Sequence, residues 1–325
     1  MKLIVDDKIP FIRGLAERLA DEVVYLPGAA ITADDVRDAD ALIVRTRTVC
    51  NRQLLEGSRV RFIATATIGY DHLDTPYLDE AGIAWTNCPG CNATSVAQYV
   101  RNSLLQAEKA GLVCLSEATL GIVGYGHVGR AVCKAMRPYV KEICLNDPPL
   151  TIPQTTLQNI AATCDIITLH TPLTTDGPYP TRHLVDERFL CELTRRPIII
   201  NAARGGVMDE GALLRAMDNG QVRQAIIDTW ENEPDLNLEL LRRVFIGTPH
   251  IAGYSADGKA NATRMSLEAL AKHFHLPAMD YPLSVPLADA SRTGLQYNPL
   301  DDSRALKQAP DSFEKIRGNY PFRRE

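Results

Sequence analysis

Short apolar runs alternate with helix-length segments along most of the chain. Four of these runs fall within residues 1–90 (LIVDD, ALIVR, RFIATAT and IAWTN), and five more fall within residues 119–230 (TLGIVGYG, EICLND, DIITLH, PIIINAA and QAIIDTW). Runs that are apolar at nearly every position indicate parallel strands covered by helices on both faces. The two series therefore predict an α/β fold with two doubly wound parallel-sheet domains.

Two longer helical patterns separate and follow these series, over residues 94–115 and 256–274. Beyond them, six of the 20 prolines fall in the last 50 residues, which disfavours regular structure. We expect the chain to leave one domain, form a second and return by the later helix. The predicted parts are a first domain over 1–93, an inserted domain over 94–255, a return helix over 256–275 and an extended tail over 276–325, with one short helix near 311–316.

Composition and charge narrow the class of protein. The chain has 325 residues, of which 45% are hydrophobic and 23% are charged, as in an ordinary globular protein of two domains. No apolar run approaches the roughly 20 residues of a membrane-spanning helix, and the N-terminus lacks the pattern of a secretory signal. The net charge of −5 argues against a nucleic-acid partner. We expect a cytoplasmic protein that binds neither nucleic acid nor membrane.

Eight cysteines are present, several of them inside apolar runs, as is usual for free thiols in a reducing compartment. Cys88 and Cys91 form a C-x-x-C pattern, but no second pair of ligands lies at the spacing of a zinc site. We interpret this pattern as a Pro-Gly turn and predict no metal.

A glycine-rich motif lies between an apolar strand and a helix, where Gly124, Gly126 and Gly129 form G-x-G-x-x-G. In this pattern the first glycine makes the tight turn, the second admits a pyrophosphate, and the third lets the helix pack on the strand. The next strand ends at Asp147, about 20 residues later, where a carboxylate binds ribose hydroxyls and repels a 2′-phosphate. A turn without a ligand would not require this strand, helix and acid together. We predict a Rossmann-type domain that binds NAD rather than NADP.

Three charged residues follow apolar strands of the second series. They are Arg204 in NAARGG, Glu233 in TWENEP and His250 in TPHIAG. Because ligands collect at the carboxyl ends of parallel strands, we expect the three side chains to converge. An imidazole base, a carboxylate that orients it and a guanidinium that holds an anion suit the oxidation of a 2-hydroxy acid.

Each of the three residues also has a simpler interpretation. A histidine after a strand often packs or caps, a loop arginine is usually solvated, and a glutamate before proline is usually a surface acid. Their joint occurrence downstream of a nucleotide motif favours catalysis. Ser255 has no partners for a hydrolytic triad, which argues against a hydrolase.

These motifs resemble the D-isomer-specific 2-hydroxyacid dehydrogenases, in which GYGHVG, HTPLT, NAARGG, DTWENEP and PHIAG occur in this order. The short spacing between Glu233 and His250 is similar to one branch, whose members oxidise 4-phosphoerythronate. The same branch is indicated by VDDKIP, TATIGYDHLD, PGCNA, DGPYPTRHL, HIAGYSADGKA and the terminal RGNYPFRRE. The resemblance extends over nearly the whole chain.

The resemblance implies a Rossmann-type cofactor domain inserted in a smaller flavodoxin-like substrate domain, and a homodimer. It implies NAD-dependent oxidation of 4-phospho-D-erythronate to 2-oxo-3-hydroxy-4-phosphobutanoate, in pyridoxal 5′-phosphate synthesis. The implied catalytic residues are Arg204, Glu233 and His250, with His250 as the proton donor in reduction. The implied NAD contacts are Asp147, Thr171, Asp228 (to the nicotinamide amide) and Gly253, and the implied substrate contacts are Thr46, Thr67 and Tyr254.

Two features depart from that branch. Thr46 stands where the branch often has serine, a change that keeps the hydroxyl. Only residues 276–325 follow the return helix, where members of the branch usually carry a longer domain that builds the dimer. We interpret this tail as a remnant of the dimerisation domain.

Five other arginine and histidine positions are further candidates. Arg45 and Arg47 follow a strand beside Thr46 and either bind the substrate phosphate or are solvated loop residues. His72 is a substrate contact, a helix cap or a surface residue. His170 suits the lining of a cofactor site, and we interpret His183 as structural.

Two further functions stay open from the sequence. The same chemistry could act on another D-2-hydroxy acid, such as phosphoglycerate. Alternatively, the protein could be a non-catalytic NAD(H)-sensing module. Substrate-dependent formation of NADH distinguishes an enzyme from a sensor.

Overall fold

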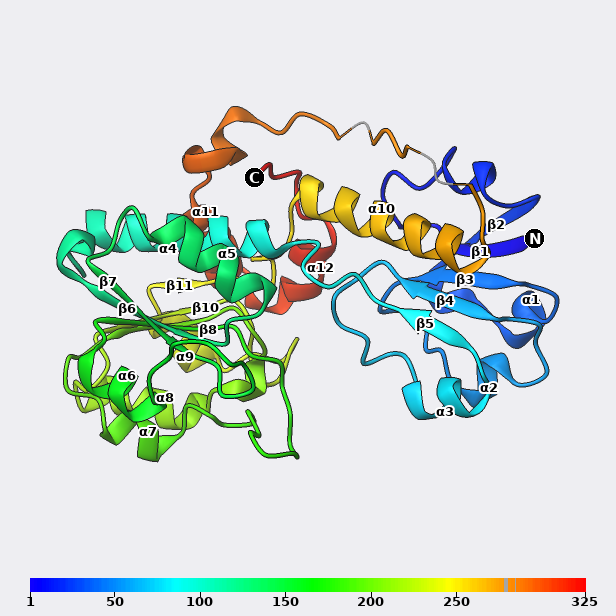
Figure 1. The fold of residues 1–325 in the computed structure, drawn as a ribbon. Coiled ribbons are helices and arrows are strands. Elements are labelled where there is room, and N and C mark those ends of the chain that lie inside the picture. The colour runs from blue at the N-terminus through cyan, green and yellow to red at the C-terminus, as the bar shows by residue number, and fades with distance from the viewer. Residues whose placement is uncertain (278–279, 284) are drawn as a thin grey trace. The chain divides into compact units, whose positions relative to one another are not determined.

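A computed structural model describes residues 1–277, 280–283 and 285–325. The chain divides into two compact units (Figure 1). Unit 1 comprises Met1–Asn92 and Ser255–Leu287, and unit 2 comprises Ala93–Tyr254 and Ala288–Glu325. Residues 278, 279 and 284 of the predicted tail lie outside the described residues.

Unit 1 contains a five-stranded parallel sheet in the order β2-β1-β3-β4-β5. Its strands are β1 Lys2–Asp6, β2 Glu22–Leu26, β3 Ala41–Val44, β4 Phe62–Thr65 and β5 Ala84–Thr86. Its helices are α1 Ala33–Val36, α2 Arg52–Leu55, α3 Thr75–Glu80 and α10 Ala256–His273, the last of which packs on the sheet through Leu267 and Leu270. Strand β2 was not predicted, because it is an edge strand with no fully buried residue.

Unit 2 contains a six-stranded parallel sheet in the order β11-β10-β9-β8-β6-β7. Its strands are β6 Thr119–Val123, β7 Glu142–Asn146, β8 Ile166–Leu169, β9 Ile198–Asn201, β10 Gln224–Ile227 and β11 Ile246–Gly247. The strand order of unit 1 recurs here with one strand added. Chain direction across the sheet switches between β6 and β8, and ligands of such sheets bind outside the carboxyl ends of strands at this switch point.

Helices cover both faces of the sheet in unit 2 (Figure 1). On one face lie α4 Ala93–Lys109 and α5 His127–Met136; on the other lie α6 Leu157–Thr163, α7 Glu187–Cys191, α8 Glu210–Asp218 and α9 Leu238–Arg243. Successive strand residues face opposite cores, since Ile198 and Ile200 pack in the α4 cluster and Ile199 packs in the α8 cluster. Burial on both faces explains the continuous apolar runs and confirms the predicted fold class.

The C-terminal segment is not the extended tail that the sequence predicted. After Leu287 it belongs to unit 2 and forms α11 Pro299–Gln308 and α12 Phe313–Gly318. Leu306 and Phe313 enter the apolar core of that unit. Helix α11 was missed because its sequence, PLDDSRALKQ, contains few apolar residues, although Asn298 caps its N-terminus. The short helix predicted near 311–316 corresponds to α12.

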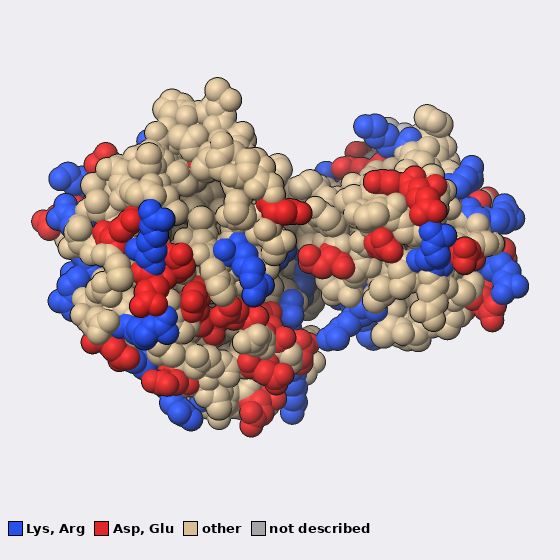
Figure 2. Space-filling model, turned by 90° about the horizontal axis from the view of Figure 1, so that it is seen from below, with Lys and Arg blue, Asp and Glu red and all other residues tan. Residues whose placement is uncertain are grey.

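Neither the surface charges nor the cysteines indicate a further functional site. On the face shown in Figure 2, acidic and basic side chains are interspersed over the protein. Within the described ranges, no helix combines the length and apolar character needed to span a bilayer. The eight cysteines are free thiols, and Cys88 and Cys91 pack in a small buried cluster with Ala262.

Candidate active site

Three neighbouring strands of unit 2 bring the predicted catalytic residues to one edge of the sheet. Arg204 follows β9, Glu233 follows β10 and His250 follows β11, and these strands are adjacent in the sheet. Because the strands are parallel, the loops after them emerge on the same side.

Glu233 and His250 form a direct pair. Oε2 of Glu233 lies 2.8 Å from Nδ1 of His250, and Oε1 accepts a hydrogen bond from the backbone N–H of Trp230 at 2.8 Å. Both carboxylate oxygens are therefore fixed. Since an ionised carboxylate only accepts, Nδ1 carries the proton and Nε2 is the nitrogen left for proton exchange.

The surroundings keep Glu233 ionised. Burial alone would raise the pKa of this carboxyl, but the hydrogen bond and charge of His250, the Trp230 amide and the charge of Arg317 together hold the pKa below its usual range. An ionised carboxylate at Nδ1 orients the imidazole through this hydrogen bond.

Asp228, which is buried at the end of β10, holds the backbone of the loop that carries His250. Its Oδ1 accepts hydrogen bonds from Thr248 Oγ1 at 2.6 Å and from the Ile251 amide at 2.7 Å. Its Oδ2 accepts from the Ala252 amide at 2.9 Å, and its carbonyl accepts from the His250 amide at 2.9 Å. The backbone of His250 has a φ of 56°, a conformation that costs a non-glycine residue about 1–3 kcal/mol unless its surroundings fix it. The four bonds to Asp228 supply that constraint.

Three buried polar groups extend this network, and sequence reasoning missed all of them. The Tyr99 hydroxyl lies 2.7 Å from Thr248 Oγ1 and donates the hydrogen bond, because Thr248 Oγ1 already donates to Asp228. Trp230 Nε1 donates to the Thr248 carbonyl at 2.9 Å. Burial, with the negative charge of Asp228, raises the pKa of Tyr99 well above its usual range. The only signal available in the sequence was the presence of single polar residues within apolar segments.

Arg204 is anchored beside the loop that carries Glu233. The side-chain amide of Asn201 donates to the Arg204 carbonyl at 2.9 Å, and a Cβ on Gly205 would lie only 1.8 Å from the Trp230 carbonyl oxygen, so only glycine fits there. The guanidinium donates to the Ala203 carbonyl at 2.8 Å. Over the described ranges no carboxylate pairs with it, which leaves donors for an anionic ligand.

The glycine motif has the geometry of a pyrophosphate site. Gly124 adopts a φ of 91° against the backbone of His170, and a Cβ on Gly129 would lie 2.0 Å from the Gly124 carbonyl oxygen. A Cβ on Gly126 would meet nothing within 4 Å, and this residue begins α5 without a side-chain cap. The free amides at that helix end suit phosphate binding.

The residues around the switch point also fit a dinucleotide. Oδ2 of Asp147 accepts from the Tyr125 amide at 2.6 Å, which fixes the carboxylate beside the glycine loop. Oγ1 of Thr171, just after β8, is buried and has no hydrogen-bond partner among the residues described. Burial lowers the pKa of His170 to about 3, so this histidine stays neutral. Gly253 lies in the turn before Tyr254.

Unit 1 carries Thr46 and Thr67. Thr46 is exposed, whereas Thr67 donates to the Gly69 carbonyl at 2.8 Å and lies 2.7 Å from Thr65 Oγ1. Nε2 of His72 lies 2.9 Å from the same Thr65 oxygen. His72 is buried, and its pKa is lowered by that burial. It is therefore neither a surface residue nor a cap, and it supports Thr67 through Thr65.

The two arginines beside Thr46 differ in their surroundings. Arg45 donates from Nε and Nη2 to the buried carboxylate of Asp6 at 3.2 and 3.4 Å. Arg45 is therefore held by Asp6 through two hydrogen bonds. Arg47 is exposed.

Tyr254 and His183 complete the predicted set. The hydroxyl of Tyr254 accepts a hydrogen bond from Nε of Arg317, in α12, at 3.1 Å, a residue that sequence reasoning did not single out. His183 is hydrogen-bonded to Glu231, which ties its loop to the segment after β10.

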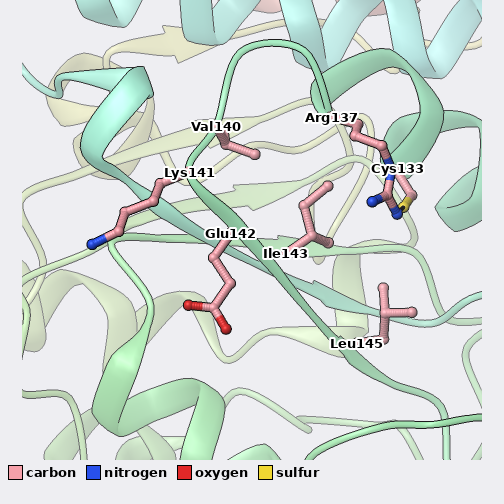
Figure 3. Close-up of a pocket in the computed structure, with 7 residues that line it drawn as sticks. All are labelled: Cys133, Arg137, Val140, Lys141, Glu142, Ile143 and Leu145. Atoms are coloured by element: carbon pink, nitrogen blue, oxygen red, sulfur yellow. Dashed lines mark hydrogen bonds between the residues drawn. The ribbon is translucent and has the colours of Figure 1, made fainter.

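A separate cavity of about 300 Å³ lies in unit 2, beside α5 and β7 (Figure 3). Its lining includes Cys133 and Arg137, whose side chains lie next to each other, and Leu145. The β7 residues in this lining precede the carboxyl end of the strand, whereas Asp147 follows it. The cavity contains none of the candidate site residues.

Comparison with known proteins agrees with this geometry. The family model for the D-isomer specific 2-hydroxyacid dehydrogenase, NAD binding domain, matches residues 92–252. Proteins named erythronate-4-phosphate dehydrogenase from Bacteroides thetaiotaomicron and Escherichia coli O81 are 52% and 41% identical to this chain. The alignments cover the whole chain and 97% and 92% of those relatives. They span 339 and 352 positions, so both relatives contain residues that this chain lacks.

Solved structures of 2-hydroxyacid dehydrogenases have the same fold as this chain. An NAD⁺-bound 3-phosphoglycerate dehydrogenase from Entamoeba histolytica is 25% identical, with a TM-score of 0.71 over 88% of this chain and 99% of that one. A D-2-hydroxyisocaproate dehydrogenase, 21% identical with a TM-score of 0.69 over 84% of this chain and 97% of that one, shares the fold. The predicted cofactor, NAD, and the predicted class of enzyme are thereby confirmed. The chain belongs to the D-isomer specific 2-hydroxyacid dehydrogenases, in the branch of the erythronate-4-phosphate dehydrogenases.

Proposed function

We propose that this enzyme oxidises 4-phospho-D-erythronate to 2-oxo-3-hydroxy-4-phosphobutanoate, a step in pyridoxal 5′-phosphate synthesis. The observation that carries the proposal is the Glu233–His250 pair, in which Nε2 of His250 is free of Glu233. The pair follows β10 and β11, and Arg204 follows β9, the other neighbour of β10 in the sheet. The name of the two relatives supports the choice of substrate.

The three residues divide the chemistry between them. Arg204 grips the substrate carboxylate with two parallel hydrogen bonds. Nε2 of His250 takes the proton of the C2 hydroxyl, and Glu233 stabilises the imidazolium that forms. NAD held at the glycine loop of Gly124, Gly126 and Gly129 would supply the acceptor for the hydride of C2. In reduction, His250 returns the proton to the carbonyl oxygen.

We assign NAD binding to residues 94–255 and substrate binding to residues 1–93, with 256–275 as the return helix. The amides around Gly124, Gly126 and Gly129 would hold the pyrophosphate, and Asp147 would hold the ribose hydroxyls. The unpartnered Oγ1 of Thr171 supports a cofactor contact after β8. Asp228 and Gly253 complete the proposed NAD contacts, with Asp228 on the nicotinamide amide.

Thr46, Thr67 and Tyr254 are the proposed substrate contacts. For the phosphate we favour Arg45, because Asp6 orients its guanidinium and leaves Nη1 without a bond to that carboxylate. An oriented guanidinium matches the geometry of a phosphate better than a flexible one.

A homodimer in the cytoplasm is the proposed state of the enzyme. The C-terminal segment exposes Leu295 and Phe322, which are 57% and 46% exposed, and this supports its role as a remnant of a dimerisation surface. The free thiols support a reducing compartment. Light scattering of the purified enzyme tests the dimer directly.

The substrate is tested with a panel of D-2-hydroxy acids assayed by the absorbance of NADH. The panel contains 4-phosphoerythronate, erythronate, 3-phosphoglycerate and glycerate, so that chain length and phosphate vary separately. The expected order places 4-phosphoerythronate first in kcat/KM. A preference for 3-phosphoglycerate would reassign the substrate, and NAD binding without turnover of any member would identify a sensor.

A further inference from the structure

The C-terminal segment reaches the loop that carries His250 and Tyr254. From α12, Arg317 donates from Nε to the Tyr254 hydroxyl at 3.1 Å. Its positive charge also acts on Glu233, where it helps to keep the carboxylate ionised. The ring of Tyr320 meets the ring of Tyr254 edge-on, with centroids 6.1 Å apart.

A second arginine of the C-terminal segment, Arg323, contacts the same loop at Ala252. Arg323 is 0% exposed, and its Nη2 donates to the Ala252 carbonyl at 2.6 Å and to the Ser95 carbonyl at 3.3 Å. Throughout the described part of the chain no carboxylate pairs with it, although the Tyr297 ring lies 4.5 Å from the guanidinium carbon. The negative charge of Asp302 acts on Arg323, but no carboxylate contacts the guanidinium directly in the described residues. Burying such a cation is costly, so its short bond to this loop needs a functional explanation.

Residue 252 is therefore held from both sides. Its N–H is bound by the Asp228 carboxylate at 2.9 Å, and its carbonyl is bound by the Arg323 guanidinium at 2.6 Å. This residue lies two positions from His250 and two from Tyr254. A shift of its peptide groups would move both functional side chains.

The C-terminal segment has its own anchor. The hydroxyls of Tyr297 and Tyr320 both donate to Oδ2 of Asp302, at 2.8 and 2.7 Å, and Arg292 donates to Oδ1 at 2.9 Å. Asp302 is buried. Arg317 and Arg323 therefore lie in a segment that is fixed by its own buried hydrogen bonds.

We propose that Arg317 and Arg323 are positioning residues for catalysis, which hold the loop of residues 250–254 and so set the places of His250 and Tyr254. The inference rests on the proposed roles of Glu233 and His250. It assigns part of the catalytic geometry to a segment that the sequence alone marked as an extended tail.

Amide hydrogen exchange tests the loop without any need for turnover. Arg323→Met removes the cation and keeps an unbranched apolar side chain, while Arg304→Met is the matched control, because Arg304 is an exposed arginine of α11 paired with Asp301. Peptides covering residues 248–256 should exchange at least about tenfold faster in Arg323→Met, with no change in the control. Equal exchange in the two variants would overturn the role of Arg323.

Kinetic measurements test whether Arg317 positions the catalytic residues or only contributes to the structure. Arg317→Met should lower kcat by about ten- to a hundredfold, and the acidic limb of the kcat profile should move to higher pH, because one charge that keeps Glu233 ionised is lost. Arg317→Lys keeps the charge, so the limb should stay in place while KM rises through the weakened bond to Tyr254. An Arg317→Met profile that coincides with that of Arg304→Met would overturn the role of Arg317.

The two sets of data separate this inference from the proposed function. If the unmodified enzyme turned over none of the phosphorylated acids, the substrate assignment would fail, and hydrogen exchange would still decide whether the C-terminal arginines hold the loop. If turnover occurs but the arginine variants match the control in exchange and in kinetics, the inference alone fails.

Discussion

Glu210 is a buried acid whose neutralisation should stabilise the protein in a pH-dependent way. It is the first residue of α8 and is 4% exposed, and its Oε1 accepts a hydrogen bond from the Glu231 amide at 2.8 Å. Burial, with the negative charges of Glu231, Glu233 and Asp209, raises the pKa of Glu210 from 4.5 to about 7, against the opposing effect of that hydrogen bond.

The sign of the effect follows from this raised pKa. Below pH 4.5 the carboxyl is neutral in both the folded and the unfolded chain. Between pH 4.5 and about 7 the unfolded chain ionises first, so folding loses stability as the pH rises. Above pH 7 the folded chain carries a buried charge, and the loss reaches about 3 kcal/mol. Glu210→Gln should recover most of this free energy at pH 8 and little at pH 5, because glutamine keeps the acceptor for the Glu231 amide.

Urea unfolding at pH 5 and pH 8 measures the difference. Trp85 and Trp230 are the two tryptophans of the chain, so a Trp85→Phe background makes fluorescence report on Trp230 in unit 2. Glu187→Gln is the control, since Glu187 also begins a helix after an aspartate cap but is 70% exposed at its side chain. The control should change stability by less than about 1 kcal/mol at either pH. An equal gain for Glu210→Gln at the two pH values, or no gain at pH 8, would refute the reasoning.

Three further substitutions test the proposed site. His250→Ala should lower kcat by about two to four powers of ten with NAD binding nearly unchanged, as measured by turnover and by fluorescence titration; activity within a few-fold of the unmodified enzyme would remove His250 from acid–base catalysis. Arg204→Lys should lower kcat/KM by about ten- to a hundredfold for phosphorylated and phosphate-free acids alike, and a loss confined to phosphorylated acids would place Arg204 at the phosphate end. Asp147→Ala should narrow the preference for NAD over NADP by about tenfold, measured as the ratio of kcat/KM for the two cofactors, and the idea fails if the unmodified enzyme already uses both equally.

The parts of the fold that the sequence predicted are those with a local signal. Ile198, Ile199 and Ile200 are all buried because both faces of β9 are covered, and this burial is visible as a continuous apolar run. Gly124 and Gly129 are fixed by close backbone contacts within one strand–turn–helix unit, so their spacing is also a local signal. The meeting of Glu233 and His250 could be predicted because parallel strands send their following loops to one edge.

The parts that could not be predicted depend on contacts between distant segments. The bond between Arg317 and Tyr254 joins residues 63 positions apart, and that between Arg323 and Ala252 joins residues 71 apart. No periodicity in the sequence encodes such a pairing. Helix α11 was missed for a related reason, because its buried side chains include the polar Asp302 and Ser303 as well as Leu306, so it has no repeated apolar stripe.

A parallel sheet brings loops together but does not orient the side chains they carry. In this enzyme the orientation of His250 comes from two carboxylates of the segment after β10, five positions apart. Glu233 binds the imidazole ring through Nδ1, and Asp228 binds the backbone on both sides of that ring through the amides of residues 250, 251 and 252. Because the ring and its backbone are fixed from the same neighbouring segment, a movement of that segment would carry the imidazole with it. The pair would then stay intact while its position relative to a substrate changed. Contacts from a different segment, such as those we propose for Arg317 and Arg323, would fix the loop independently of the segment after β10.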